Sequence, residues 1–253
     1  MIKYIFIIFL VINFSLDARE IGETEITTEE GIEVYQDEKY YLLKKNVKID
    51  SDSFTLLGDL IKIFFSEDMY DIQNIDAQGN VELTSQNYGI NAKGINLNFN
   101  VSTEEIIIKG LNSELITQDS EMYSDGEIFV NNKSGKFIIL GKNSKLINED
   151  IYIKGNYIDG IFINSDNNKN IKNLNVEDNN LSYIKTETTE MYAKNITYSK
   201  ANSIIELHDN VKIIRDGEII EGDYGRLNTI TNSYKVQSKD KNKVKVIIKQ
   251  NNE

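Results

Sequence analysis

The chain has 253 residues, of which 40% are hydrophobic, and carries 40 Asp and Glu against 28 Lys and Arg. The net charge of -12 argues against a nucleic-acid partner, because phosphate binding needs a basic face and the sequence contains no basic cluster with interleaved aromatics. The lack of cysteine excludes disulfide scaffolds, thiolate metal sites and cysteine nucleophiles.

Residues 1–18 are predicted to form a signal peptide. Lys3 precedes a nearly unbroken apolar run of eleven residues from Tyr4 to Phe14, and Ala18 is followed by a charged stretch. A helix that crosses a bilayer needs about 20 apolar residues, whereas a secretory h-region is shorter. We therefore expect an exported chain that begins near Arg19. An uncleaved short anchor is the alternative.

Residues 19–31 are predicted to be a flexible acidic leader, residues 32–248 one repeat β-domain, and residues 249–253 a tail. Apolar and polar residues alternate along the domain, for example from Ile95 to Phe99, which is typical of half-buried strands. We expect about three short, mostly antiparallel strands in each repeat. The polar segment 164–173 is expected to be a loop insertion, and residues 243–248 one more strand.

A motif returns six times along the domain. Each copy opens with an apolar residue after a polar turn, and these residues are Val47, Val81, Leu115, Leu146, Leu181 and Val211. A small residue and a polar one follow: Gly58-Asp59, Ala92-Lys93, Ser124-Asp125, Gly155-Asn156, Ala193-Lys194 and Gly222-Asp223. The steps between the small residues are 34, 32, 31, 38 and 29. Such a period indicates stacked units, each of which buries its apolar face against its neighbours.

Two stretches resemble the OstA/LptA-type repeat of periplasmic lipopolysaccharide-transport proteins. Residues 77–99 contain Gly79-Asn80-Val81 and then Ala92-Lys93, and residues 207–238 contain Asp209-Asn210-Val211 and then Gly222-Asp223. The resemblance covers about residues 43–238, with looser third and fourth units. It departs from the pattern where Lys45 and Asp209 replace the glycine before Asn-Val.

The resemblance implies an all-β fold: an open, twisted β-jellyroll of stacked antiparallel repeats with an apolar groove. It implies a periplasmic bridge protein that binds lipopolysaccharide and carries lipid A acyl chains from the inner to the outer membrane, without cofactor, metal or catalytic residue. The implied partners are lipopolysaccharide, inner-membrane and outer-membrane transport components of the same fold, and further copies docked head to tail through residues 32–65 and 207–248. The residues predicted to line the lipid groove are Val47, Ile49, Val81, Leu83, Ile95, Leu97, Phe99, Ile106, Ile108, Ile128, Val130, Ile151, Ile153, Val211 and Ile213.

Several alternatives stay open at this point. The two sheets of such a fold either close on each other or splay into a trough. The chain could be a membrane-anchored partner of the same transport system, or a secreted parallel β-helix that acts as an adhesin or on carbohydrates.

A catalytic carboxylate row is disfavoured, because Lys93 and Lys194 stand where other repeats have Asp. The single histidine, His208, is expected to be a solvated turn residue. The acidic charge conflicts with lipid phosphates unless the head groups stay outside the groove or divalent cations intervene.

Overall fold

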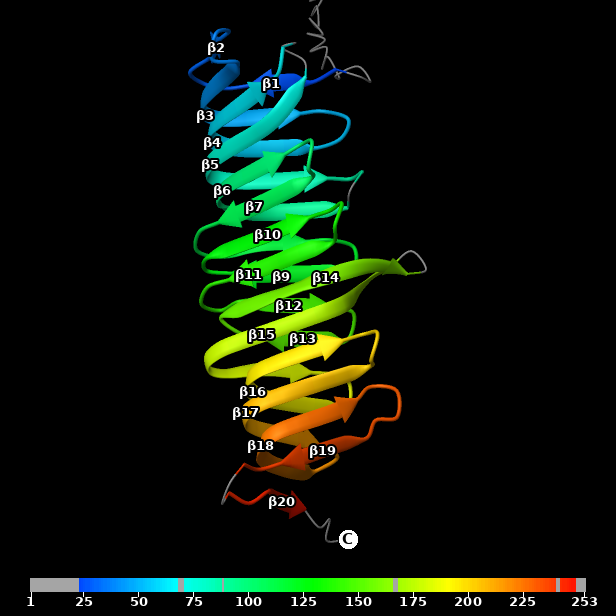
Figure 1. Cartoon of the computed structure of the whole chain (residues 1–253). Coiled ribbons are helices and arrows are strands. Elements are labelled where there is room, and N and C mark those ends of the chain that lie inside the picture. Colours follow the sequence, from blue (N-terminus) through cyan, green and yellow to red (C-terminus); the bar gives the residue numbers. More distant parts are fainter. Residues whose placement is uncertain (1–22, 68–70, 88, 166–167, 240–241, 249–253) are drawn as a thin grey trace, which may run out of the picture.

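The computed structural model describes residues 23–67, 71–87, 89–165, 168–239 and 242–248 as an elongated stack of strands that runs from the N-terminal to the C-terminal end (Figure 1). All twenty elements in these residues are β-strands. Every pairing between them is antiparallel. The antiparallel pairing confirms the predicted all-β jellyroll and excludes the parallel β-helix.

Long strands near both ends bend in the middle, so that each contributes to two sheets. In the N-terminal part these strands are β3 (Tyr40–Asp50), β4 (Thr55–Phe65), β5 (Ile72–Ser85) and β6 (Ile90–Asn100). In the C-terminal part they are β15 (Asn168–Lys185), β16 (Thr189–Ser199), β17 (Ile204–Arg215) and β18 (Glu218–Asn228). The ladder between β3 and β4 shows the bend, because the pairing jumps from Lys44↔Leu60 to Val47↔Gly58.

The middle of the stack uses separate strands on either side of the bend. These are β7 (Glu105–Lys109), β8 (Ser113–Ile116), β9 (Ser120–Ser124), β10 (Glu127–Asn131), β11 (Lys136–Leu140), β12 (Lys145–Asn148), β13 (Ile151–Lys154) and β14 (Tyr157–Ser165). Short strands complete the ends: β1 (Glu25–Thr27), β2 (Ile32–Tyr35), β19 (Tyr234–Gln237) and β20 (Lys245–Ile248).

Two sheets therefore run side by side along the stack. The first sheet has the order β2-β3-β4-β5-β6-β7-β10-β11-β14-β15-β16-β17-β18-β19. The second sheet has the order β1-β3-β4-β5-β6-β8-β9-β12-β13-β15-β16-β17-β18-β20. They share one edge, the line of bends, which we call the corner.

The repeated motif of the sequence builds this corner. The polar turns place consecutive residues in the left-handed region, as at Gly79-Asn80 (φ 72° and 47°) and Asp209-Asn210 (φ 62° and 57°). Gly, Asn and Asp adopt this conformation at low cost. The small residues of the motif lie where the sheets approach most closely. A Cβ on Gly155 would come within 2.7 Å of Val176 Cγ1, and one on Gly222 within 2.6 Å of Val236 Cγ1.

The residues that face inward from the two sheets form one continuous core along the stack. Ile61, Ile108, Leu146 and Leu207 are examples with no exposed surface. The inward face follows from the alternation of apolar and polar residues in each half-strand. At the corner the alternation breaks, because residues on both sides of the bend face outward.

Four details differ from the sequence-based expectations. Segment 164–173 is not a loop insertion, because most of it belongs to β14 and β15, whose inward face includes Ile171 (5% exposed). The repeats near both ends contain long bent strands rather than three short ones. In the fifth repeat Leu181 is 40% exposed, and the neighbouring Ser182 is buried instead. β1 lies within the predicted leader and pairs with β3. The predicted signal peptide and tail lie outside the described residues.

Candidate functional site

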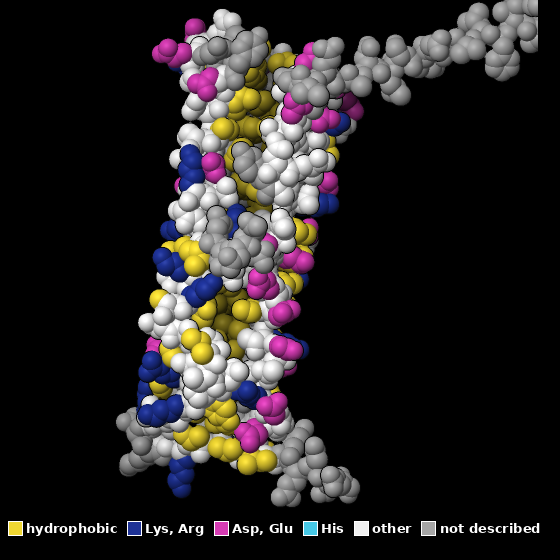
Figure 2. Space-filling view, turned by 90° about the vertical axis from the view of Figure 1, so that its right-hand side faces the viewer, with side chains coloured by type: hydrophobic (Ala, Val, Ile, Leu, Met, Phe, Trp, Pro, Cys, Tyr) yellow, Lys and Arg dark blue, Asp and Glu magenta, His cyan; other side chains and the backbone are white. Residues whose placement is uncertain are grey.

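The side of the stack opposite the corner is open. Turns at the far ends of the half-strands form two rims there, one for each sheet. The first-sheet rim includes residues 101–104, 132–135, 200–203 and 229–233, and the second-sheet rim includes residues 51–54, 117–119, 149–150, 186–188 and 216–217. Figure 2 looks onto this side and shows a furrow of hydrophobic side chains between two walls, visible in the upper part and again in the lower half. We call this furrow the trough.

The trough contains a narrow cleft in its N-terminal half. Its lining is almost entirely apolar, and its volume of about 40 Å³ is small. The lining residues are Phe54, Leu83, Ser85, Ile90, Phe99, Glu104, Ile106 and Asn132. A cavity needs roughly 10–15 Å³ to hold one water molecule, so this cleft has room for only a few waters.

A larger cleft of about 420 Å³ lies in the C-terminal half. Pockets that hold small ligands measure about 300–1,000 Å³. Its apolar lining comes from both sheets: Ile151, Ile153, Ile171, Leu174, Ile184, Met191, Tyr198, Ile205 and Leu227. Its mouth is polar and consists of Glu149, Asp150, Thr186, Glu187, Thr188, Thr189, Thr229 and Asn232. Burial raises the pKa of the Tyr198 phenol, so this group is neutral in the cleft.

Hydrogen bonds connect the two rims between these clefts. The Asn148 side-chain amide donates to the Asp119 carbonyl (2.9 Å), to Ser120 Oγ (2.9 Å) and to the Lys169 carbonyl (3.1 Å). The Lys169 backbone N–H donates to Asp119 Oδ2 (3.0 Å). Ser120 and Asn148 belong to strands of the second sheet and Asp119 to its rim, whereas Lys169 is the second residue of β15 in the first sheet. We call these four residues the clasp. Asn148 and Ser120 are buried, with 3% and 5% exposure.

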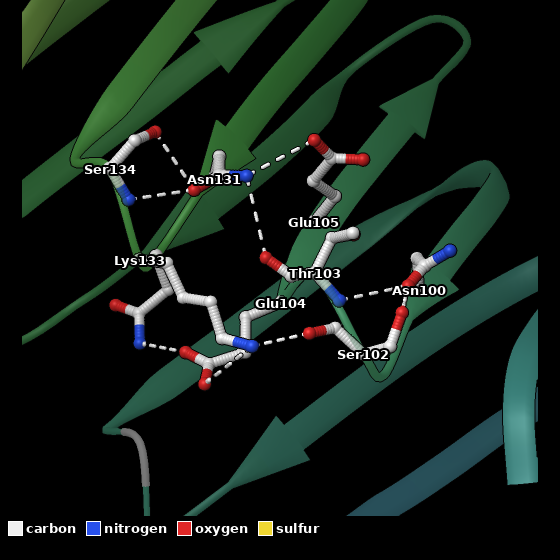
Figure 3. A network of polar contacts seen from close by, with 9 residues as sticks. Asn100, Ser102, Thr103, Glu104, Glu105, Asn131, Lys133 and Ser134 are labelled. Carbon is white, nitrogen blue, oxygen red and sulfur yellow. Dashed lines mark hydrogen bonds and ion pairs between the residues drawn. The ribbon is translucent and has the colours of Figure 1, made fainter.

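The clasp is tied to the first-sheet rim. Lys169 Nζ donates to Asn132 Oδ1 (2.8 Å), and Asn132 Nδ2 donates to Glu104 Oε2 (2.8 Å). Figure 3 shows the network that joins turns 101–104 and 132–135. In it, Asn131 Nδ2 donates to Glu105 Oε1 (3.0 Å), and the Ser134 N–H donates back to Asn131 Oδ1 (2.7 Å). The first-sheet rim is therefore a braced edge rather than a row of independent turns.

Three equivalent turns on the second-sheet rim place different residues over the trough. In each turn a Ser or Thr backbone N–H donates to the carbonyl of the third residue onward: Ser51 to Phe54 (2.9 Å), Thr117 to Ser120 (2.8 Å) and Thr186 to Thr189 (2.9 Å). Each hydroxyl also donates to the same carbonyl. The last residue of the turn lines the N-terminal cleft (Phe54), belongs to the clasp (Ser120) or lines the C-terminal cleft (Thr189). The Ser/Thr spacing is a sequence signal for these turns that the repeat analysis missed.

Most of the residues predicted to line the groove face the interior, but they differ in accessibility. Leu83, Phe99 and Ile106 line the N-terminal cleft, and Ile151 and Ile153 line the C-terminal one. The buried core contains Val47, Ile49, Val81, Leu97, Ile108, Ile128, Val211 and Ile213, and Val130 packs against it. The prediction for Ile95 is wrong, since this residue is 47% exposed. It lies at the corner, where the inward alternation resumes only at Leu97.

The polar residues weighed as catalytic candidates lie at the corner, outside the trough. Asp59 accepts a hydrogen bond from Asn80 Nδ2 (2.9 Å). Hydrogen bonds from Asn143 and the Asn112 N–H lower the pKa of Asp125, and bonds from the Lys239 N–H and Asn242 lower that of Asp223. His208 packs near Tyr224, with 5.2 Å between ring centroids. Among the described residues, no group of three or more His, Cys, Asp or Glu side chains is placed to hold a metal ion.

No helix in the described part of the chain is long and apolar enough to cross a membrane. None of the curated proteins compared with the chain matches it. Among solved structures, it is similar to the crystal structure of LptH, described as the LptA homologous periplasmic component of the conserved lipopolysaccharide transport device from Pseudomonas aeruginosa. The identity is 17% and the TM-score 0.42, over 53% of this chain and 96% of that one.

The model of the family described as "LptA/(LptD N-terminal domain) LPS transport protein" matches residues 26–136 and 143–233. Because these segments make up most of the sequence, the chain belongs to the LptA/LptD N-terminal domain family of lipopolysaccharide transport proteins.

Proposed function

We propose that this protein is a periplasmic carrier of lipopolysaccharide, which holds the acyl chains of lipid A in the trough and leaves the head group in solvent. The observation that carries the proposal is the C-terminal cleft of about 420 Å³ on the open side of the stack, which combines an apolar interior with a polar mouth. A ligand with a long hydrocarbon part and a bulky polar part fits a furrow that is open along its length better than a closed pocket.

The energetics suit transport. Burial of one methylene group contributes about 0.8 kcal/mol, so an acyl chain of about twelve carbons gains on the order of 10 kcal/mol relative to water. This prevents escape, yet transfer between two similar troughs changes the free energy little. Directed movement then depends on an energy source elsewhere in the transport system. No bond is made or broken, so the function needs no catalytic residue.

The charge of the mouth sets the orientation of the ligand. Glu149, Asp150 and Glu187 line the mouth of the C-terminal cleft, and carboxylates repel phosphates. The phosphorylated head group is therefore expected to extend away from the trough. This resolves the conflict between the net charge of -12 and an anionic lipid.

The two ends of the stack are suited to docking with proteins of the same fold. Ile32 and Val34 of β2 are 48% and 45% exposed, and Val246 and Ile248 of β20 are 52% and 65% exposed. The described pairings leave one edge of β2 and one edge of β20 open. An open strand edge can accept a strand from a partner. We propose head-to-tail stacking, which would join the troughs of inner-membrane and outer-membrane components.

Site-specific photocrosslinking tests the proposal. A photoreactive amino acid is placed in the full chain at Ile205, which lines the C-terminal cleft, or at its neighbour Glu206 as the control. These residues face opposite sides of β17. Purified lipopolysaccharide is expected to crosslink at position 205 and not at position 206. Equal labelling at both positions, or none at 205, would rule out binding in the trough.

A membrane-anchored member of the same system is the second candidate. The choice depends on residues 1–22, which lie outside the described part of the chain. N-terminal sequencing of the protein from the cell envelope separates the two possibilities: a start near Arg19 supports the free carrier, and a retained Met1 supports the anchored partner.

A further inference from the structure

The interior of the trough changes character halfway along its length. On both sides of the midpoint most inward-facing residues are apolar, with a single buried Ser85 or Thr189 at the rim, but at the midpoint two neighbouring inward positions, Ser120 of β9 and Asn148 of β12, are polar. A buried polar side chain is retained in an apolar interior only when it is hydrogen-bonded. The Asn148 amide meets this requirement because the two hydrogens of its Nδ2 are shared among three acceptors, one of which belongs to the opposite rim.

Two aromatic rings occupy the first-sheet side of the same region. Phe137 and Phe162 are stacked with 4.3 Å between ring centroids, and their exposures are 0% and 7%. Gly160 leaves room for this pair, since a Cβ there would lie 2.5 Å from Phe137 Cζ. Phe162 pairs with Ile171 on β15, two residues from the clasp residue Lys169. The trough is thus bridged by the clasp and filled by aromatic side chains in one place.

The space on the two sides of this barrier is unequal, about 40 Å³ toward the N-terminal end and about 420 Å³ toward the C-terminal end. On the second sheet, the C-terminal part extends over five strand spacings from β12 to β18, which is about 24 Å at about 4.8 Å per spacing. The acyl chains of one leaflet span about 15 Å, half of a hydrocarbon core of about 30 Å. The C-terminal part is therefore long enough for an acyl chain that lies along the axis.

We propose that the clasp and the aromatic pair form the end wall of a single lipid site, so that the acyl chains are held in the C-terminal compartment and the N-terminal compartment is closed to them while the clasp is intact. This inference rests on the proposed function and locates its site. The ligand class is an amphiphile with extended acyl chains and a hydroxyl-rich head group. Threonine and asparagine side chains from both rims, such as Thr188 and Asn232, stand at the mouth where such a head group would lie.

The proposal makes passage along the whole trough depend on the clasp. A hydrocarbon chain cannot replace the hydrogen bonds of Asn148, so it does not displace this residue without leaving buried polar groups unpaired. Asn148→Leu, in contrast, removes the amide and presents an apolar side chain to the midpoint. In this variant Lys169 keeps its N–H bond to Asp119 but loses the link to Asn148, and the inference predicts that hydrocarbon passes the midpoint more readily.

The test compares crosslinking at two positions of the full chain: Ile205 in the C-terminal compartment and Phe99 in the N-terminal one. The probes are purified lipopolysaccharide and, separately, palmitic acid. With the native clasp, capture at position 205 is expected to exceed capture at position 99 at least fivefold for both probes. In the Asn148→Leu background, capture at position 99 is expected to rise at least threefold.

Ser144→Ala is the matched control. Ser144 is fully buried and hydrogen-bonded to Ser124 (3.1 Å) and the Gly141 carbonyl (2.8 Å), but it lies at the corner, away from the clasp. This variant loses buried hydrogen bonds and should leave the ratio between the two positions unchanged. If Asn148→Leu fails to fold, Asp119→Ala, which removes only the carboxylate that accepts from the Lys169 N–H, replaces it.

The possible outcomes are distinct. Equal capture at the two positions in the native background, or an unchanged ratio in the clasp variants, overturns the inference. Capture of palmitic acid with the expected preference, but of lipopolysaccharide at neither position, refutes the proposed function and leaves the compartment intact. Capture of neither probe at either position refutes both.

Discussion

The N-terminal and C-terminal halves of the trough are built from the same repeat, yet their clefts measure about 40 and about 420 Å³. Both halves share the backbone plan, with bent strands, a corner and equivalent rim turns. They differ in individual side chains: the turn at Ser51 places Phe54 over the N-terminal cleft, and the turn at Thr186 places Thr189 at the C-terminal one. We infer that the repeat determines the trough, while single inward residues determine where it has room.

Removal of the aromatic pair at the boundary between the halves should have the largest effect. Phe137→Ala deletes a fully buried ring stacked on Phe162. Replacement of a buried phenylalanine by alanine costs about 3–5 kcal/mol, and we expect a loss of this size in the free energy of urea unfolding. Phe64→Ala removes a partly exposed ring on the outer face of β4 and serves as the control. A loss below about 1 kcal/mol for Phe137→Ala would show that the boundary is not tightly packed.

An exchange of the rim residues tests whether single side chains decide which half is open. Thr189→Phe should fill the mouth of the C-terminal cleft and lower lipopolysaccharide crosslinking at Ile205 about tenfold, a change equivalent to about 1.4 kcal/mol. Phe54→Thr should open the N-terminal cleft and raise crosslinking at Phe99.

The bonds that close each turn end on the backbone carbonyl of residue 54 or 189, so both variants keep them, and the 3.3 Å bond between the hydroxyls of Thr188 and Thr189 is lost in Thr189→Phe and in its control alike. Thr188→Phe, which changes the neighbouring residue of the turn, is the control. If the exchange left the ratio of the two crosslinks unchanged, the contrast between the halves would have to arise from the sheets themselves.

The two ends of the stack can be compared in the same way. Val34→Asp on β2 and Val246→Asp on β20 each add a charge to an exposed apolar end strand. If stacking is head to tail, either change alone should shift concentration-dependent oligomers to monomers in light scattering, and removal of residues 239–253 should do the same. The substitution Val101→Asp, at an exposed turn away from both ends, should leave the oligomers intact. Oligomers that persist in both end variants would place the contact elsewhere.

The sequence predicted the fold but not the division of the trough. The period of the small residues and the alternation of apolar positions are local patterns, and both have a direct physical cause in the corner and in the inward face of each half-strand. Ile95 was misassigned because the bend interrupts an alternation that looks continuous in the sequence. Segment 164–173 was taken for a loop because its many Asn and Lys residues conceal the inward position of Ile171.

The clasp could not be predicted from the sequence because its members are far apart in it. Asp119, Asn148 and Lys169 come from three separate turns or strand ends, and each is an ordinary polar residue in its local context. Their significance depends on how the two rims meet across the trough. Three residues that line the C-terminal cleft, Ile171, Leu174 and Ile184, were missed for a related reason: they belong to β15, which begins inside the segment 164–173 that was predicted to be a loop.

The smallest expected effect concerns the corner, where Asp125 and Asp223 accept hydrogen bonds from neighbouring turns in the middle and the C-terminal part of the stack. These bonds hold the pKa of both carboxyls below the ordinary value of 3.8 in the folded state. A carboxyl with a lowered pKa contributes stability above its unfolded pKa and loses that contribution as the pH falls through the folded one.

The melting temperature should therefore decrease as the pH is lowered below about 4. In Asp125→Asn and Asp223→Asn the decrease should be smaller. Both groups are exposed, so the shift at each corner should amount to no more than a few degrees. Asp37→Asn, at an exposed turn between β2 and β3, provides the comparison. If the Asp125 and Asp223 variants followed the same pH profile as the native chain, the corner hydrogen bonds would have no measurable part in the stability of either half.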